Sequence, residues 1–324
     1  MVVSARQEDG SLLGLLPLAL SSSGRLPTLR FAGATHADYL HPVCRRGDDE
    51  RVASAAGRAL VGIDDWSLVV LDNVTAGAGW WQTLGRDAGA VGLAGYRDSV
   101  LPAIEFAGAD WNEYLAGRGR SFREQARRYP RRLERHHRVS YRRTTEESEL
   151  ERDMTTFFSL HDARWGTRGG SSLAGERARR FHLDFALSAL RQGWLRLWFL
   201  EVDGAPAAAW YGWRIGSRYA YYQAGFDPRF SSLAVGFVLM VHTVRAALEE
   251  AASTYDMLLG DEPYKARFCN DSRDVRTVTL SRSRAGYLAT AVEASLWKGS
   301  RLLPPRMRHL PRGIGQRLPS ARTR

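Results

Sequence analysis

A polar cluster with the sequence Gly-Asp-Glu-Pro-Tyr-Lys occupies residues 260–265, directly after the apolar run 255–259. The apolar run is typical of a buried strand, and ligand clefts often form where strands end. Lys265 is one of two lysines among the 46 basic residues of the chain. A lysine ammonium is a compact point charge, so Lys265 could stabilise a developing oxyanion, and Asp261 or Glu262 could accept a proton. The alternative is that arginine replaced lysine throughout the chain and Lys265 remained by chance.

A turn of small residues at 231–236 precedes an apolar helix predicted over residues 237–251. Because the turn follows a predicted strand, the first N–H groups of the helix would point outward and could hold a pyrophosphate or another anion. The turn contains a single glycine, which makes the motif weak. The anion-binding candidates are Ser231, Ser232, Ala234, Val235 and Gly236.

An arginine-rich segment at 118–143 is predicted to form a basic helix. Its arginines at 120, 123, 127, 131 and 135 recur every three or four residues and would form one stripe, although Pro130 would kink or interrupt the helix. The stripe could bind the phosphates of coenzyme A, a nucleotide-linked sugar, tRNA or an anionic lipid surface, with Arg127 and Arg131 as candidate contacts. The alternative is an ordinary solvated helix face.

His161 lies near the end of an amphipathic helix predicted over residues 146–164. It could act as a general base, or it could be a packed histidine without a chemical role.

The other elements follow from hydrophobic periodicity and from turn residues such as Asp9-Gly10 and Asp203-Gly204. Together they predict a mixed sheet of the α+β class, with an antiparallel meander in the second half. The main predicted strands are 12–18, 26–31, 66–71, 101–106, 194–202, 205–215, 218–224, 255–259 and 275–280. Further helices are predicted at 48–60 and 181–192.

The net charge of +11 is unevenly distributed along the chain. Residues 106–143 hold 11 basic and 4 acidic residues, and residues 275–324 hold 11 basic and 1 acidic residue. The end of the chain is therefore predicted to be flexible and able to touch anions or a membrane surface. Cys44 and Cys269 are solitary, which indicates a reducing cytoplasm and gives no metal motif. No apolar run reaches the roughly 18 residues of a membrane-spanning helix.

The order of elements from residue 110 onward resembles a GNAT N-acetyltransferase fold. Several motifs further resemble the CelD/BcsL-type acetyltransferases associated with cellulose and exopolysaccharide biosynthesis. These motifs are Trp111-x-x-Tyr114-Leu115, Arg131-Arg132-Leu133-Glu134, Leu160-His161-x-x-Arg164-Trp165, Tyr222-x-x-Gly225-Phe226-Asp227-Pro228 and Gly260-Asp261-Glu262-x-Tyr264-Lys265.

The resemblance extends to the first part of the chain through Gly14-Leu15-Leu16-Pro17-Leu18 and Asp38-Tyr39. It implies tandem GNAT-like domains at 1–105 and 106–290, the first degenerate or truncated at its N-terminus, followed by a basic tail at 291–324. The tandem arrangement also resembles FemABX aminoacyltransferases, in which an aromatic-lysine pair lies near the acyl transfer site, as Tyr264-Lys265 would.

The resemblance implies acetyl-CoA or another acyl-CoA as co-substrate and no metal. The catalytic candidates are Lys265, Asp261, Glu262, His161 and Tyr264. The candidates for substrate binding are Arg164, Trp165, Tyr222, Asp227, Arg127 and Arg131.

Three functional hypotheses follow. The first is a cytoplasmic acyltransferase that moves an acyl group from CoA to an amine or hydroxyl of a sugar or cell-envelope precursor. The second keeps the fold but takes the acyl group from aminoacyl-tRNA. The third is a catalytically inactive scaffold in polysaccharide biosynthesis.

Overall fold

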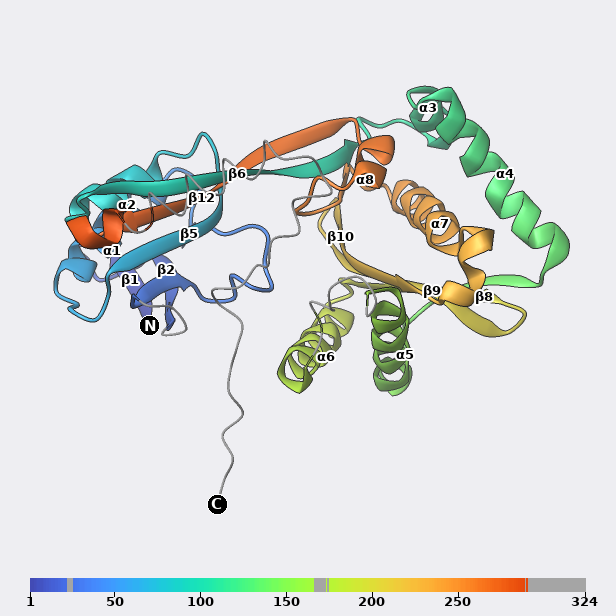
Figure 1. The fold of residues 1–324 in the computed structure, drawn as a ribbon, viewed down its shortest axis with the longest axis horizontal. Coiled ribbons are helices and arrows are strands. Elements are labelled where there is room, and N and C mark those ends of the chain that lie inside the picture. Colours follow the sequence, from blue (N-terminus) through green and yellow to red (C-terminus); the bar gives the residue numbers. More distant parts are fainter. Residues whose placement is uncertain (22–25, 166–172, 174, 289, 291–324) are drawn as a thin grey trace, which may run out of the picture. The chain divides into compact units, whose positions relative to one another are not determined.

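The computed structural model describes residues 1–21, 26–165, 173, 175–288 and 290 (Figure 1). The chain forms two compact units, Met1–Val100 with Asp274–Arg324, and Leu101–Arg273. The predicted tail at 291–324 lies outside the described residues. The predicted second domain ran to residue 290, whereas the structure divides the chain after Arg273. The reason is that β12 (Asp271–Ser281) pairs antiparallel with β5 (Leu68–Thr75) of the first unit from Val275 onward.

The first unit is a mixed sheet with two helices. The hairpin predicted at Asp9-Gly10 is confirmed, and Gly10 takes the positive φ of 81° that such a turn favours. The strand β3 pairs antiparallel with β2 and parallel with β5. The elements are β1 (Val2–Arg6), β2 (Leu12–Ser21), β3 (Thr28–Phe31), β4 (Val43–Cys44), α1 (Asp49–Val61), β5, α2 (Trp80–Asp87), the start of β6 (Gly92–Glu105), and β12.

Within the second unit the strands follow the order β6-β11-β10-β9-β8-β7. Its strands are β7 (Val139–Arg143), β8 (Leu195–Val202), β9 (Ala205–Ile215), β10 (Arg218–Phe226) and β11 (Thr254–Asp256). The predicted meander is confirmed, since β8, β9 and β10 pair antiparallel in sequence order. The pairing of β10 with β11 is parallel.

Helices cover both faces of this part of the sheet (Figure 1). One face carries α3 (Trp111–Ala116), α4 (Arg120–His136) and α7 (Val235–Glu249), and the other carries α5 (Glu147–Trp165) and α6 (Glu176–Arg191). Successive residues of a strand point to opposite faces, so β9 sends Trp210 into the core beside α7 and Tyr211 into the core beside α5.

The basic helix α4 runs through Pro130 without interruption, so of the two predicted effects of the proline, a kink or an interruption, the interruption does not occur. Apolar contacts before the proline hold the helix in place, and Leu133 after it is buried in the same core. The ring of Phe122 lies 4.8 Å from that of Phe268, and the ring of Tyr129 lies 5.6 Å from that of Phe237. The buried face leaves most of the arginines exposed on the opposite face.

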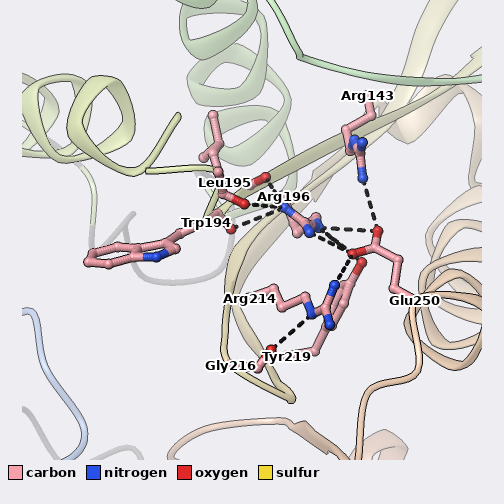
Figure 2. Close-up of polar contacts among 9 residues, drawn as sticks. Arg143, Trp194, Leu195, Arg196, Arg214, Gly216, Tyr219 and Glu250 are labelled. Atoms are coloured by element: carbon pink, nitrogen blue, oxygen red, sulfur yellow. Dashed lines mark hydrogen bonds and ion pairs between the residues drawn. The ribbon is translucent and has the colours of Figure 1, made fainter. Parts of the chain in front are cut away.

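A cluster of arginines surrounds one carboxylate at the C-terminal end of α7 (Figure 2). Glu250 accepts hydrogen bonds from Arg196 at 2.5 Å, Arg143 at 2.9 Å and Arg214 at 3.3 Å. Arg196 is only 8% exposed and also donates to the hydroxyl of Tyr219 at 3.0 Å. The cluster therefore joins four strands of the sheet to the end of the helix.

Candidate active site

The strands β10 and β11 pair over only three residues each. Arg218, Tyr219 and Ala220 face Thr254, Tyr255 and Asp256, whereas β10 continues to Phe226. After Asp256 the chain turns away at Leu258, whose φ is 54° and whose N–H donates to the Asp256 carboxylate at 2.8 Å. The C-terminal half of β10 is thus left without a strand on this side within the described part of the chain.

A cavity of about 290 Å³ lies beside this unpaired half of β10. It is lined mainly by apolar groups, and Arg164 is its one charged side chain among the described residues. The lining residues come from β9, from β10, from the turn before α7, from α7 itself, from α5 and from α8 (Pro263–Phe268). They are Arg164, Ala209, Trp210, Tyr221, Ala224, Gly225, Phe226, Ser231, Ala234, Val235, Gly236, Phe237, Leu239, Met240, Tyr264 and Phe268.

The N-terminus of α7 borders this cavity. The helix begins at Val235, two residues earlier than predicted, after Ala234 with a left-handed φ of 56°. No side chain caps it, so its first N–H groups and its positive dipole end are left for a ligand. Four of the five predicted anion-binding residues line the cavity, namely Ser231, Ala234, Val235 and Gly236, whereas Ser232 does not.

Tyr264 and Arg164 bring polar groups to an otherwise apolar wall. Burial raises the pKa of the Tyr264 hydroxyl far above its usual value, and neighbouring Tyr221 raises it further, so the hydroxyl keeps its proton at neutral pH. Arg164 donates from Nη1 to the carbonyl of Ala224 at 3.2 Å and lies 5.4 Å from the ring of Phe226. No carboxylate pairs with Arg164 within the described part of the structure. This cation is therefore available to an anionic or polarised ligand group.

The structure places Lys265 beneath the cavity wall and not on it. Its side chain is buried, and Nζ donates to the carbonyl of Leu259 at 2.8 Å and pairs with Glu262 at 3.0 Å. Gly260 has a φ of 133°, a backbone conformation that favours glycine. Asp261 and Glu262 are exposed, and neither lines the cavity. The lysine thus fixes the loop that leads into Tyr264.

His161 is buried at 1% exposure, and its Nε2 lies 3.3 Å from the side-chain oxygen of Gln223. Burial lowers its pKa, so the ring is neutral at pH 7. Neither His161 nor Trp165 lines the cavity, although Trp165 lies 4.8 Å from the guanidinium of Arg164.

The other predicted substrate contacts lie apart from this cavity. Tyr222 packs against His182 in the core beside α6, with ring centroids 5.1 Å apart. Asp227 accepts a hydrogen bond from the Arg229 N–H at 2.9 Å and caps the short 3-10 helix Pro228–Leu233. Arg127 and Arg131 line a different cavity, between α4 and α7.

Two glycines at the cavity differ in the space around them. A Cβ on Gly225 would lie 2.3 Å from the backbone nitrogen of His161, whereas a Cβ on Gly236 would meet Phe226 at an ordinary 3.4 Å. We expect Gly225→Ala to reduce the free energy of unfolding by about 1–3 kcal/mol, because α5 would have to move. Gly236→Ala should leave stability unchanged or raise it by up to about 1 kcal/mol. Chemical denaturation of both variants checks this pair, and equal stabilities would contradict it.

Comparison with known proteins finds similarity to a known family in the second unit. Residues 120–266 match the family model described as acetyltransferase (GNAT) domain. No curated protein matches the chain. Among solved structures, a domain assigned as the C-terminal part of a lysylphosphatidylglycerol synthetase from Agrobacterium fabrum aligns with a TM-score of 0.57 at 13% identity, covering 91% of this chain and 88% of that one.

Two further structures align over a similar length. L-PGS from Bacillus licheniformis gives a TM-score of 0.58 at 12% identity and covers 92% of this chain and 89% of that one. FemX gives a TM-score of 0.60 at 10% identity and covers 90% of this chain and 90% of that one. These likenesses show a shared GNAT-like fold, as predicted, and the finer resemblance to CelD/BcsL-type proteins stays a prediction. Among the described residues, no helix is both long and apolar enough to cross a membrane.

Proposed function

We propose that this GNAT-fold chain transfers an acyl group from acyl-CoA to an amine or hydroxyl of a sugar or cell-envelope precursor. One observation carries the proposal, namely that the cavity beside β10 extends to the uncapped N-terminus of α7. The pyrophosphate of CoA would bind the N–H groups of Val235 and Gly236, and the acyl-bearing arm would lie along the apolar wall. Acyl-CoA and charged tRNA are both cytoplasmic donors, so we place the reaction in the cytoplasm.

In the proposed reaction, the acceptor nitrogen or oxygen attacks the thioester carbonyl, and the carbon–sulfur bond breaks. Arg164 would stabilise the carbonyl oxygen as it gains negative charge. Tyr264 would give its hydroxyl proton to the departing thiolate, which leaves as free CoA. The acceptor loses one proton, which returns to Tyr264 through water.

The remaining catalytic candidates take supporting roles in this proposal. Lys265 holds the loop before Tyr264, because its ammonium is already bonded to the Leu259 carbonyl and to Glu262. Asp261 and Glu262, both exposed, would pass the acceptor proton to the water that reprotonates Tyr264. His161 is enclosed by α5 and β10 and would support the strand that lines the cavity.

A thermal-shift screen with acetyl-CoA, longer acyl-CoAs and aminoacyl-tRNA tests the donor. A ligand at 100 times its dissociation constant should add about 2.7 kcal/mol of stability. Gly236→Glu should abolish stabilisation by CoA esters, because its carboxylate would lie at the helix terminus that holds the pyrophosphate. Gly236→Ala is the matched control and should bind normally. Equal binding by Gly236→Glu and wild type would refute this location, and stabilisation by neither donor would favour the inactive scaffold.

A second candidate function, aminoacyl transfer from tRNA, is favoured by the exposed arginines of α4. The exposed arginines of this helix include Arg120, Arg127, Arg131 and Arg135. If they grip a nucleic acid, tRNA affinity should fall steeply with salt, because each neutralised phosphate releases counterions. Binding measured between about 50 and 200 mM salt would then weaken by orders of magnitude, whereas CoA binding would change much less.

A further inference from the structure

A second cavity, of about 300 Å³, lies between α4 and α7. On α7 it is lined by Val238, Val241, His242 and Arg245, which recur at helical spacing and share one face. The cavity beside β10 is lined by other α7 residues, among them Gly236, Leu239 and Met240. The two cavities therefore use different faces of the same helix, and the proposed donor site does not account for the second one.

The charge of this second cavity is predominantly positive. Three arginines line it: Arg127 and Arg131 lie one helical turn apart on α4, and Arg245 lies on α7. The single carboxylate in the lining is that of Glu134. Neither Arg127 nor Arg131 forms an ion pair with any described residue, and like charges at this spacing repel each other. Arg245 pairs with Glu249 at 3.1 Å, but both of those side chains are largely exposed. An anion in the cavity would relieve this repulsion.

The stacked rings of Tyr141 and His242 form one wall of the cavity. His242 stacks on Tyr141 with ring centroids 3.9 Å apart and an interplanar angle of 8°. Its Nε2 is buried without a hydrogen-bond partner among the described residues. Burial, together with the charge of Arg245, lowers the pKa of His242 to about 4, so the ring is neutral at pH 7. A buried ring nitrogen of this kind normally has a partner, which a ligand oxygen would supply.

We propose that this cavity binds a small phosphorylated sugar, either a sugar phosphate or a nucleotide. Arg127, Arg131 and Arg245 would hold the phosphate, because guanidinium groups match its geometry. Glu134 and His242 would bond the sugar hydroxyls. The volume is near the lower limit of cavities that hold small ligands, which fits one phosphorylated sugar unit and not a longer chain.

Calorimetric titration of the full chain at fixed ionic strength tests this site with glucose 1-phosphate, AMP and inorganic phosphate. We expect one equivalent of glucose 1-phosphate or AMP to bind, more tightly than inorganic phosphate, and the preferred one identifies the ligand type. The double variant Arg127→Gln/Arg131→Gln should lose at least about ten-fold in affinity. His242→Phe keeps a stacking ring but lacks the nitrogen, and it should weaken binding of the preferred ligand.

Two controls separate this site from general surface charge and from the donor site. Arg135→Gln removes an exposed charge of the same helix outside the cavity and should bind within about two-fold of wild type. Gly236→Glu should bind the phosphorylated sugar normally, even if it loses CoA. The proposal would be overturned if no probe bound, or if inorganic phosphate bound as tightly as the phosphorylated sugars. It would also be overturned if Arg135→Gln lost as much affinity as the double variant, or if Gly236→Glu lost affinity for the phosphorylated sugar. Circular dichroism and melting temperature establish that each variant folds.

Discussion

Tyr264→Phe should lower kcat for acyl transfer by a factor of about 10² to 10⁴ while donor affinity stays close to that of wild type. The phenyl ring keeps the cavity wall intact, and only the proton donor for the leaving thiolate is lost. The hydroxyl carries its proton at neutral pH because burial raises its pKa, so the wild-type rate should not depend on titration of Tyr264 near pH 7. Steady-state kinetics with a thiol-trapping assay gives kcat and KM separately.

Tyr129→Phe is the matched control for this variant. Tyr129 is also partly buried in the second unit but does not line the cavity. Loss of the Tyr129 hydroxyl should therefore leave kcat unchanged. A Tyr264→Phe enzyme with full kcat and a normal melting temperature would show that the thiolate is protonated by another group. A rise in KM with unchanged kcat would instead assign Tyr264 to donor binding.

Glu250→Ala should lower the free energy of unfolding by about 3–5 kcal/mol. The variant leaves Arg143, Arg196 and Arg214 facing one another without their shared carboxylate, and Arg196 is nearly fully buried. Glu249→Ala is the control on the neighbouring position. Its side chain is 66% exposed and pairs only with Arg245 in the described structure, so we expect a change within about 0.5 kcal/mol.

The same carboxylate predicts a pH dependence of stability. Burial opposes ionisation of Glu250, but the hydrogen bond from Arg196 and the surrounding guanidinium charges outweigh it and lower its pKa. A carboxylate with a lowered folded-state pKa stabilises the fold above its unfolded pKa of about 4.3, and this contribution is lost as the pH falls further. Urea denaturation between pH 7 and pH 3 should show this loss in wild type and a smaller loss in Glu250→Ala. An equal loss of stability with falling pH in wild type and in Glu250→Ala would show that Glu250 does not cause it.

The sequence predicted the meander, the helix after it and the turn at 231–236 well, because each has a clear periodicity or a turn motif. It did not predict which residues of β10 line the cavity. A bulge between Tyr221 and Gln223 shifts the alternation along the strand, so Tyr221, Ala224 and Phe226 reach the cavity. Local patterns carry no signal for such a bulge.

The chemistry of Lys265 was also beyond local sequence patterns. Lys265 stands out in the sequence because lysine is rare in this chain. Its hydrogen bonds, however, depend on a turn in which Leu258 adopts a φ of 54°, a conformation that leucine seldom takes. This turn orients the nearby carbonyls toward the ammonium group. Local patterns likewise carry no signal for the pairing of the last described strand. The partner of β12 is β5, and the backbone N–H of Asn73 reaches Thr277 across 204 positions of sequence.

Hydrogen–deuterium exchange of the full chain, with and without a non-hydrolysable acetyl-CoA analogue, tests whether the cavity beside β10 is the donor site. We expect slower exchange in peptides that cover residues 221–226, 234–240 and 263–268, and unchanged exchange in peptides from residues 1–75. The 234–240 peptide should show the largest effect, since its N–H groups would bond the pyrophosphate. Protection elsewhere with none at the start of α7, or no protection at saturating analogue, would contradict the assignment of this cavity as the donor site.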